Sequence, residues 1–371
     1  MRRERQAVSA LFATNGALFA TVLPRLPEIK ADLGLSDGQL GLALLGLGLG
    51  GLGGSTASGW LLPRAGARRL AVGATLVLAL LVPMIGLAAS APVLLGVLLV
   101  VGFSDALTDV AMNVSGIEVQ RRMGRPVLSS MHAVWSIGAV LGGLAGTAAA
   151  GLRVPVAVHL AVVAAVLLAV VLAVSRAVPD HSGAGTGERT GARLSPALAV
   201  LCLLAVCAAF VEDAPASWSA IYLVEHTGAP IGAAGLAFTA YMAAMVLGRL
   251  VGDRVVARLG PVLVVRAGGL LVAGALAVGL LAGSTVPAVL AFAVVGLGAA
   301  SLFPALFTAA GALPGQGVAV MNAASRVGFL ASPPVVGALS DGVGLPLALG
   351  LLVVPAAVGI ALLAGAVRPR A

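Results

Sequence analysis

Charged residues are scarce in this chain of 371 residues: they make up 10% of the sequence, whereas hydrophobic residues make up 60%. A soluble domain carries roughly 25% charged residues, because its surface must remain in contact with water. The shortage excludes a soluble enzyme built around one core. It predicts an integral membrane protein instead.

Aromatic residues are also few, at 4%, and the only two cysteines, Cys202 and Cys207, lie in one apolar run. The formal net charge of +8 comes from basic residues scattered in twos and threes between apolar runs. Because the sequence has neither a basic face nor an aromatic stacking platform, we expect no nucleic-acid partner. The cysteines are interpreted as small packing residues, which say nothing about redox compartment.

Catalytic motifs are missing as well. The sequence contains no His-Glu-x-x-His, no Gly-x-Ser-x-Gly and no phosphate-binding loop. Two carboxylates four residues apart, Asp105 and Asp109, could in principle bind a metal, which leaves a membrane-embedded enzyme as a remote alternative. We expect no enzyme activity, no cofactor and no metal site.

Long apolar segments are what the chain has in abundance. A membrane-spanning helix needs roughly 20 mainly apolar residues. Such segments occur at 6–24, 38–62, 69–90, 92–117, 127–150, 154–175, 195–223, 231–251, 261–283, 287–310, 317–340 and 345–367. The sequence therefore predicts an all-α, multi-pass protein of the cell (inner or plasma) membrane with about twelve transmembrane helices.

A polar, glycine-rich stretch divides these segments into two sets of six. We expect an N-terminal bundle at 1–175, a cytoplasmic linker at 176–194 and a C-terminal bundle at 195–371. If the N-terminus is cytoplasmic, about 18 of the 22 basic residues fall on the cytoplasmic side, which is the asymmetry typical of membrane proteins. Both termini are therefore predicted to be cytoplasmic. In this assignment Arg249 is cytoplasmic, and Arg25 belongs to the outer side.

Two short motifs recur half a chain apart. Met131–Gly138 aligns with Met321–Gly328, and Arg64–Gly66 aligns with Arg258–Gly260, at offsets of about 190 and 194 residues. Internal repeats of this kind are typical of transporters, whose solute site lies near the midplane where the halves meet. The many glycines of 38–62 predict a smooth helix-packing face.

Polar groups inside the apolar segments are candidates for function, because burying them in a bilayer is costly. Asp105, Asp109 and Asn113 are spaced by four and so share one helix face. Counted from the intervening loop, Asp109 and His132 should lie at similar depth. A carboxylate beside an imidazole can hold a proton near neutral pH, which suggests proton coupling. The segment of His132 also carries Trp135 and Ser136.

Further candidates are Asn15, Glu212, Trp218 and Arg326. Pro215 should weaken the helix that carries Glu212. Arg326 is interpreted as the sole buried cation, which needs an anion inside the bilayer. Depth along the helices favours Asp109 as its partner in an inner gate, while Asp105 or an anionic solute remain the alternatives.

The stretch Gly59–Arg69 resembles the loop signature of the major facilitator superfamily, although Pro63 stands where the signature has Asp. The chain more closely resembles the YbjJ-like and rhizopine-permease (MosC)-like branch, which is related to fucose permeases. The motifs that carry this likeness are Asp109–Asn113, Met131–Gly138, Phe210–Glu212 with Trp218, Gly248–Leu250 and Phe329–Pro334.

The resemblance implies a secondary active transporter that moves a small polar solute, sugar-like or cyclitol-like, by alternating access. Its partners would be the solute, protons and the lipid bilayer, and we expect a monomer. A proton-driven exporter of amphipathic compounds is the alternative within transport. Such a protein needs a mostly apolar cavity, and the polar stripe at Asp105, Asp109 and Asn113 argues against one.

Overall fold

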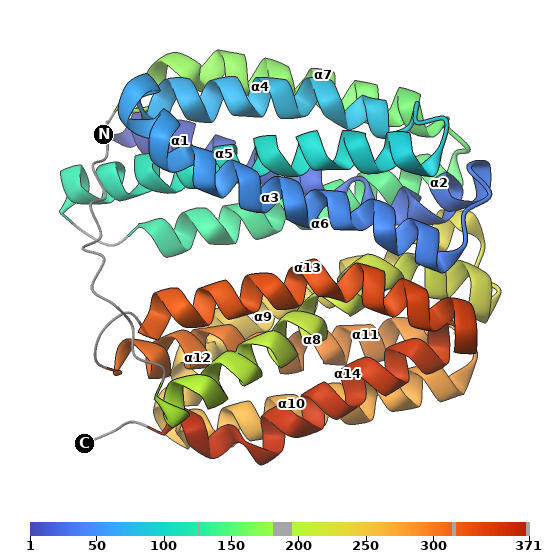
Figure 1. Ribbon diagram of the computed structural model, residues 1–371. Coiled ribbons are helices and arrows are strands. Elements are labelled where there is room, and N and C mark those ends of the chain that lie inside the picture. The colour runs from blue at the N-terminus through green and yellow to red at the C-terminus, as the bar shows by residue number, and fades with distance from the viewer. Residues whose placement is uncertain (125–126, 181–194, 314–316, 369–371) are drawn as a thin grey trace. The chain divides into compact units, whose positions relative to one another are not determined.

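The structure is a computed structural model, and it describes residues 1–124, 127–180, 195–313 and 317–368. Helices dominate these ranges (Figure 1). The first seven are α1 (Arg2–Ala20), α2 (Leu26–Asp32), α3 (Asp37–Ala65), α4 (Ala67–Ile85), α5 (Ala91–Met123), α6 (Leu128–Gly151) and α7 (Val156–Val174). The others are α8 (Pro196–Thr227), α9 (Leu236–Leu259), α10 (Pro261–Ala282), α11 (Thr285–Ala299), α12 (Leu302–Gly311), α13 (Gly317–Val343) and α14 (Leu345–Leu362).

Within the described ranges, 11 helical segments are long and apolar enough to cross a membrane. One of them combines α1 and α2, and another combines α11 and α12. Helix α13 has 27 residues but is not among the 11; it carries Arg326, Asp341 and two internal prolines. With α13 as the twelfth, the predicted all-α membrane fold of about twelve helices is confirmed. The orientation of the termini stays a prediction.

The chain divides into two compact units. Unit 1 comprises Met1–Leu35 and Leu42–Thr186, and unit 2 comprises Ser36–Gly41 and Gly187–Ala371. Most of the predicted linker 176–194 lies outside the described residues, which end at Asp180 and resume at Ser195. Each unit is therefore described by itself below.

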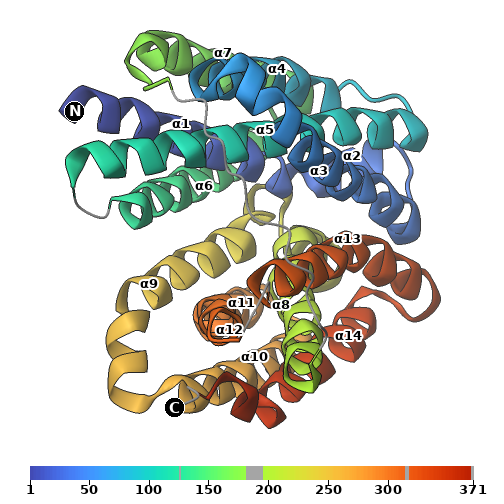
Figure 2. The same ribbon diagram turned by 60° about the vertical axis from the view of Figure 1, so that its left-hand side comes forward.

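The same pattern of helix neighbours occurs in both units. In unit 1, α1 packs along α6, and α4 contacts both α5 and α7 (Figure 1). In unit 2, α8 packs along α13, and α10 contacts both α11 and α14 (Figure 2). An internal repeat requires such a correspondence, which here pairs α1 with α8, α4 with α10 and α6 with α13.

The turns at the two aligned Arg-x-Gly motifs have the same backbone conformation. Gly66 precedes α4 with φ 80° and ψ 153°, and Gly260 precedes α10 with φ 78° and ψ 153°. A positive φ is readily adopted only by glycine, which explains the residue at both positions. The structure supports the predicted equivalence of these two motifs.

The other aligned pair ends in glycines where helices meet closely. A Cβ atom on Gly138 of α6 would overlap the carbonyl group of Ala13 in α1. A Cβ atom on Gly328 of α13 would likewise crowd Val206 and Ala209 in α8. Small residues let helices approach in lipid, where no hydrophobic force drives them together. In each unit, therefore, a glycine lets the first helix, α1 or α8, pack closely against its neighbour, α6 or α13.

A third close approach joins α3 to α5. Gly46, Gly50 and Gly54 form a ridge along α3, and a Cβ atom on any of them would overlap the backbone of α5 between Leu95 and Phe103. The spacing of four places these glycines on one helix face. The predicted smooth packing face of 38–62 is thus directed at the helix that carries Asp105 and Asp109 in unit 1.

Replacing Gly138 with Ala is expected to destabilise the protein by about 1–3 kcal/mol, because the added methyl group forces α1 away from α6. Gly59→Ala in α3 is the matched control, since a Cβ atom there would meet nothing within 4 Å. That change should be neutral or stabilising by up to about 1 kcal/mol, the helix-propensity difference. Unfolding in detergent measures both. Equal shifts for the two variants would contradict the close approach.

Candidate transport site

Two residues of the polar stripe on α5, in unit 1, bind each other within the helix. The amide nitrogen of Asn113 donates to Oδ1 of Asp109 at 3.0 Å and to the Asp109 carbonyl oxygen at 2.8 Å. A spacing of four places the two side chains one turn apart. Asp109 is exposed, whereas Asn113 is half-buried. The carboxylate and the amide therefore act as one hydrogen-bonded pair.

Asn15 joins three helices through its amide. Its Nδ2 donates to Oδ1 of Asp105 at 2.6 Å, and its Oδ1 accepts from Nε1 of Trp135 at 2.7 Å. The Asn15 side chain is buried, with 4% of its surface exposed. Both ends of the amide are used, so the side chain has one orientation. We call Asn15, Asp105 and Trp135 the Asn15 triad; it links α1, α5 and α6.

His132 of α6 reaches the acidic stripe through Asn113. Its Nε2 lies 3.1 Å from Oδ1 of Asn113, whose nitrogen in turn donates to Asp109. A neutral imidazole with its proton on Nε2 donates in this arrangement. Asp109, Asn113 and His132 are called the His132 chain. The sequence predicted Asp109 and His132 at one depth, and the structure places the Asn113 amide between them.

Two neighbours support the His132 chain. The ring of Phe12 lies edge-on to His132, with ring centroids 5.0 Å apart. Ser136 is buried, and its hydroxyl donates to the His132 carbonyl oxygen at 3.1 Å. This Ser136 contact satisfies a local backbone acceptor of α6. We therefore place Ser136 beside the site, while the Asn15 triad and the His132 chain form the site itself.

In unit 2, Glu212 of α8 contacts two residues of α9. Nη2 of Arg249 lies 3.7 Å from Oε1 of Glu212, and the hydroxyl of Tyr241 donates to the Glu212 carbonyl oxygen at 3.0 Å. The sequence did not point to Tyr241, and it predicted Arg249 on the cytoplasmic side. Arg249 lies inside α9, which continues to Leu259, and its side of the membrane stays a prediction. The pairing of Gly248 with Arg249 in a family motif was the available signal.

Trp218 and Asp213 are further polar groups of α8. Trp218 is fully buried, and its Nε1 has no hydrogen-bond partner among the described residues. Ser217 donates to Oδ1 of Asp213 at 3.4 Å, whereas Oδ2 of Asp213 has no partner in the same ranges. Helix α8 runs unbroken through Pro215, so the weakening expected there produces no break.

Arg326 lies in α13 of unit 2, and its side chain is exposed. Its predicted partner Asp109 belongs to unit 1, and their ion pair stays a prediction. The expectation that Arg326 is the sole buried cation is wrong, because Arg25 of unit 1 is completely buried.

Arg25 ends a short 3₁₀ turn, Leu23–Arg25, between α1 and α2, and its guanidinium contacts polar groups. Its guanidinium donates to both carboxylate oxygens of Glu28 and to the Val154 carbonyl oxygen at 2.6 Å. The nearby Thr21 hydroxyl lies 3.2 Å from Nε2 of His159 in α7. Arg25 is therefore part of the packed structure of unit 1, and its predicted place on the outer side stays a prediction.

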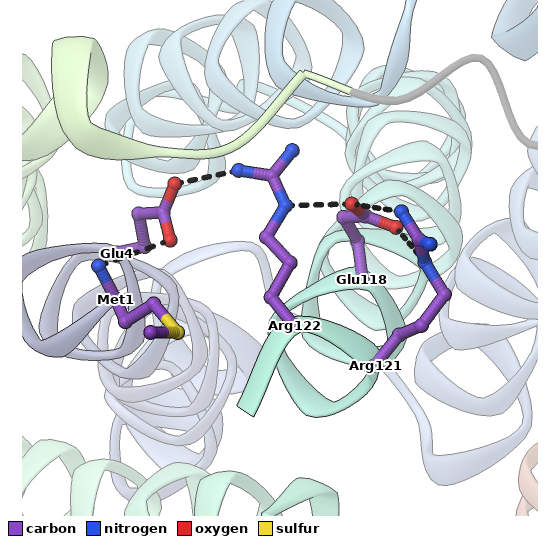
Figure 3. A network of polar contacts seen from close by, with 5 residues as sticks. All are labelled: Met1, Glu4, Glu118, Arg121 and Arg122. Atoms are coloured by element: carbon purple, nitrogen blue, oxygen red, sulfur yellow. Dashed lines mark hydrogen bonds and ion pairs between the residues drawn. The ribbon is translucent and has the colours of Figure 1, made fainter. Parts of the chain in front are cut away.

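A separate charged network ties the start of α1 to the end of α5 (Figure 3). Glu118 is buried and accepts from Arg121 and Arg122, at 2.8 Å and 2.6 Å for the closest nitrogens. Arg122 also pairs with Glu4 at 2.7 Å, and Glu4 lies 3.3 Å from the amino group of Met1. Opposite charges alternate along the chain of contacts. We assign this network to packing.

The described residues contain no group of three or more His, Cys, Asp and Glu side chains that could hold a metal. Asp105 and Asp109 therefore lack a third ligand in these ranges, and their hydrogen bonds go to Asn15 and Asn113 instead.

The comparison with known families decides the class of the protein. The family model of the Major Facilitator Superfamily matches residues 8–211 and 201–371. The chain belongs to the major facilitator superfamily. The predicted family is thereby confirmed.

Curated relatives are transporters or membrane proteins of bacteria. The uncharacterized transporter y4wD of Sinorhizobium fredii is 33% identical over 83% of this chain and 82% of its own length. An uncharacterized MFS-type transporter of Yersinia pestis is 31% identical over 91% of this chain and 89% of its own. Membrane protein MosC of Rhizobium meliloti is 25% identical over 95% of this chain and 87% of its own length. This relative agrees with the predicted branch.

Solved transporters share the fold. The nucleoside transporter NupG superposes with a TM-score of 0.76 at 15% identity, covering 99% of each chain. The fucose:proton symporter FucP of E. coli superposes with a TM-score of 0.64 at 18% identity, covering 99% of this chain and 98% of the symporter chain. At these identities the likeness concerns the fold alone. This superfamily member is thus a multi-pass transporter of the cytoplasmic membrane, as predicted, and its relatives are not enzymes.

Proposed function

We propose that this superfamily member is a proton-coupled secondary transporter of a small polar solute, sugar-like or cyclitol-like. The observation that supports this most is the two sets of polar contacts that α1, α5 and α6 carry, the Asn15 triad and the His132 chain. Together they contain two carboxylates, two amides, an imidazole and an indole. Groups of this kind bind hydroxyls and protons, and placing them inside a membrane domain is costly without such a role.

The Asn15 triad is assigned to the solute. Oδ2 of Asp105 would accept from a solute hydroxyl, while Asn15 holds Oδ1 in place. The half-buried ring of Trp135 would cover an apolar face of the solute, and its Nε1 is oriented by Asn15. Rigid polar anchors beside an aromatic face are typical of sites for small polar ligands.

The His132 chain is assigned to the proton. Asp109 and His132 are exposed side chains joined by one amide, so a proton taken up at either end changes the hydrogen bonding of the other. An exporter of amphipathic compounds remains the second candidate, and the polar lining of α5 weighs against it.

The deciding experiment is a thermal-shift screen of detergent-purified protein against sugars, polyols and amines. A ligand that binds the folded state raises its apparent stability, by about 2.7 kcal/mol at 100 times the dissociation constant. A polar compound that stabilises wild type but not Asp105→Asn would support the assignment. Stabilisation by lipophilic cations alone would favour the exporter.

A further inference from the structure

Two pairs of helices in unit 1 are in direct backbone contact. Along α1 and α6, a Cβ atom placed on Gly16, Gly138 or Gly142 would overlap a carbonyl oxygen of the other helix. The glycines that form the ridge along α3 meet the backbone of α5 in the same way. Close-packed backbone cannot slide without a rearrangement of the whole contact. The pair α1/α6 and the pair α3/α5 therefore each keep one register.

The contact between these two pairs has side chains in it instead. A Cβ atom placed on Gly116 of α5 would meet the side-chain ends of Leu128 and Met131 of α6, at 2.8 Å and 3.2 Å. The ring of Phe12 in α1 would follow at 3.8 Å. Flexible side-chain ends, methionine above all, repack readily around a displaced neighbour. This apolar contact therefore does not fix the position of α5 along α1 and α6.

Both groups of the candidate site contain a bond that crosses from one pair to the other. Asn15 of α1 donates to Asp105 of α5 at 2.6 Å, and His132 of α6 lies 3.1 Å from Asn113 of α5. A shift of α5 by one residue would move its side chains by about 1.5 Å along the helix axis, which is enough to break hydrogen bonds of this length. The site therefore depends on the register of α5.

The charged network assigned above to packing crosses between the same two pairs (Figure 3). Nε of Arg122 in α5 donates to buried Glu118 at 2.6 Å, and its Nη1 donates to Glu4 of α1 at 2.7 Å. Arg121 binds both oxygens of Glu118, at 2.9 Å and 2.8 Å. The planar guanidinium of Arg122 is thereby held in one direction, which places Glu4. We call Glu4, Glu118 and Arg122 the base network.

Neighbouring residues bind the start of α6 at the same end of α5. Oε1 of Gln120 in α5 accepts from the backbone N–H groups of Val127 and Leu128, at 3.0 Å and 3.3 Å. Arg5 of α1 donates to the hydroxyl of Ser130 in α6 at 3.3 Å. The last turns of α5 are therefore hydrogen-bonded to the starts of both helices of the α1/α6 pair.

We propose that the base network positions the candidate site by setting the register of the α3/α5 pair against the α1/α6 pair. Arg122 and Glu4 are then positioning residues, which act on the solute through Asn15 and Asp105. Their ion pair would add little stability, because their side chains are 38% and 24% exposed. Glu4 and Asn15 lie about 16 Å apart along α1, so contacts at both levels fix the tilt of α5 as well as its shift.

Asparagine side chains report the register without any solute. This inference rests on the proposed function only for the role of the site. The chain has three asparagines, Asn15, Asn113 and Asn322, so isotope labelling of this residue type gives three side-chain amide signals by nuclear magnetic resonance. Asn15 donates between the pairs, Asn113 donates within α5, and Asn322 lies in unit 2. Replacing each asparagine in turn assigns its signal.

Arg122→Gln should speed the exchange of the Asn15 amide protons with solvent about five-fold, the factor for a lost hydrogen bond worth about 1 kcal/mol. The Asn113 amide should change little, because its N–H groups bind within α5, and the Asn322 amide should not change. Glu4→Gln should act like Arg122→Gln. Glu4→Asp keeps the charge and should recover much of the wild-type exchange rate.

Glu28→Gln is the control for a general loss of stability, since it removes the carboxylate partner of buried Arg25 in the same unit. It should lower the unfolding midpoint and leave the Asn15 amide unchanged. Unchanged exchange of Asn15 in Arg122→Gln would overturn the inference. Equal acceleration of Asn15 and Asn113, or the same acceleration of Asn15 by Glu28→Gln, would overturn it too. Failure of the ligand screen would count against the proposed function and leave this result standing.

Discussion

Asp109→Asn is expected to abolish accumulation of the solute driven by a proton gradient, while exchange of the solute across the membrane continues. Asn keeps the size and the hydrogen bonding of Asp109 toward Asn113, but it cannot take up a proton. For one proton per solute, a gradient of one pH unit supports about ten-fold accumulation, since 1.4 kcal/mol corresponds to a factor of ten. The Asp109→Asn variant should show no accumulation under the same gradient.

Proteoliposomes separate the two activities. Uptake under an imposed pH gradient measures coupled transport, and counterflow of labelled solute at equal pH measures exchange. Asp253→Asn removes a negative charge from an exposed position of α9 and serves as the control, with wild-type behaviour in both assays. Normal accumulation by Asp109→Asn would remove Asp109 from the proton site and leave Asp105 or Glu212 as candidates.

Glu28→Gln should cost about 3–5 kcal/mol of stability, the range seen when one partner of a buried ion pair is removed. Arg25 has no exposed surface, and Glu28 is its carboxylate partner. Without that carboxylate the guanidinium keeps the Val154 carbonyl oxygen, which does not balance its charge. Chemical unfolding in detergent, followed by circular dichroism, gives the difference from wild type.

Two controls sharpen this result. Glu4→Gln breaks the pair between half-buried Glu4 and exposed Arg122 and should cost at most about 1 kcal/mol. The double change Arg25→Met with Glu28→Leu should recover much of the loss, because an apolar pair replaces the buried guanidinium and its half-buried carboxylate. A cost for Glu28→Gln no greater than that for Glu4→Gln would contradict a buried pair that matters for stability.

The helices were predictable because membrane spans need long apolar runs, but their ends were not. The apolar run of α5 ends near residue 117, whereas the helix continues to Met123. Arg121 and Arg122 remain helical because Glu118 binds both. The division of the predicted segment 287–310 into α11 and α12 was also missed, since Ala300 and Ser301 carry no turn signal.

The candidate site was predictable where the contacts run along one helix. The spacing of four put Asp109 beside Asn113, but the partnership of Asn15 with Asp105 depends on the rotation of two helices about their axes. Tyr241 was missed because it binds a backbone carbonyl oxygen, which no side-chain pattern reveals. The burial of Arg25 was missed because the predicted apolar segment 6–24 ends just before it.

The glycine ridge of α3 has a mechanical consequence. Gly46, Gly50 and Gly54 bring the backbone of α3 against that of α5 with no side chains between them. Packed interfaces switch between discrete arrangements mainly by repacking side chains, and this one has few to repack. The two helices should therefore move together as one rigid body. A displacement of α5 caused by proton binding at Asp109 would then move α3 as well, because few side chains at the ridge can repack to absorb it.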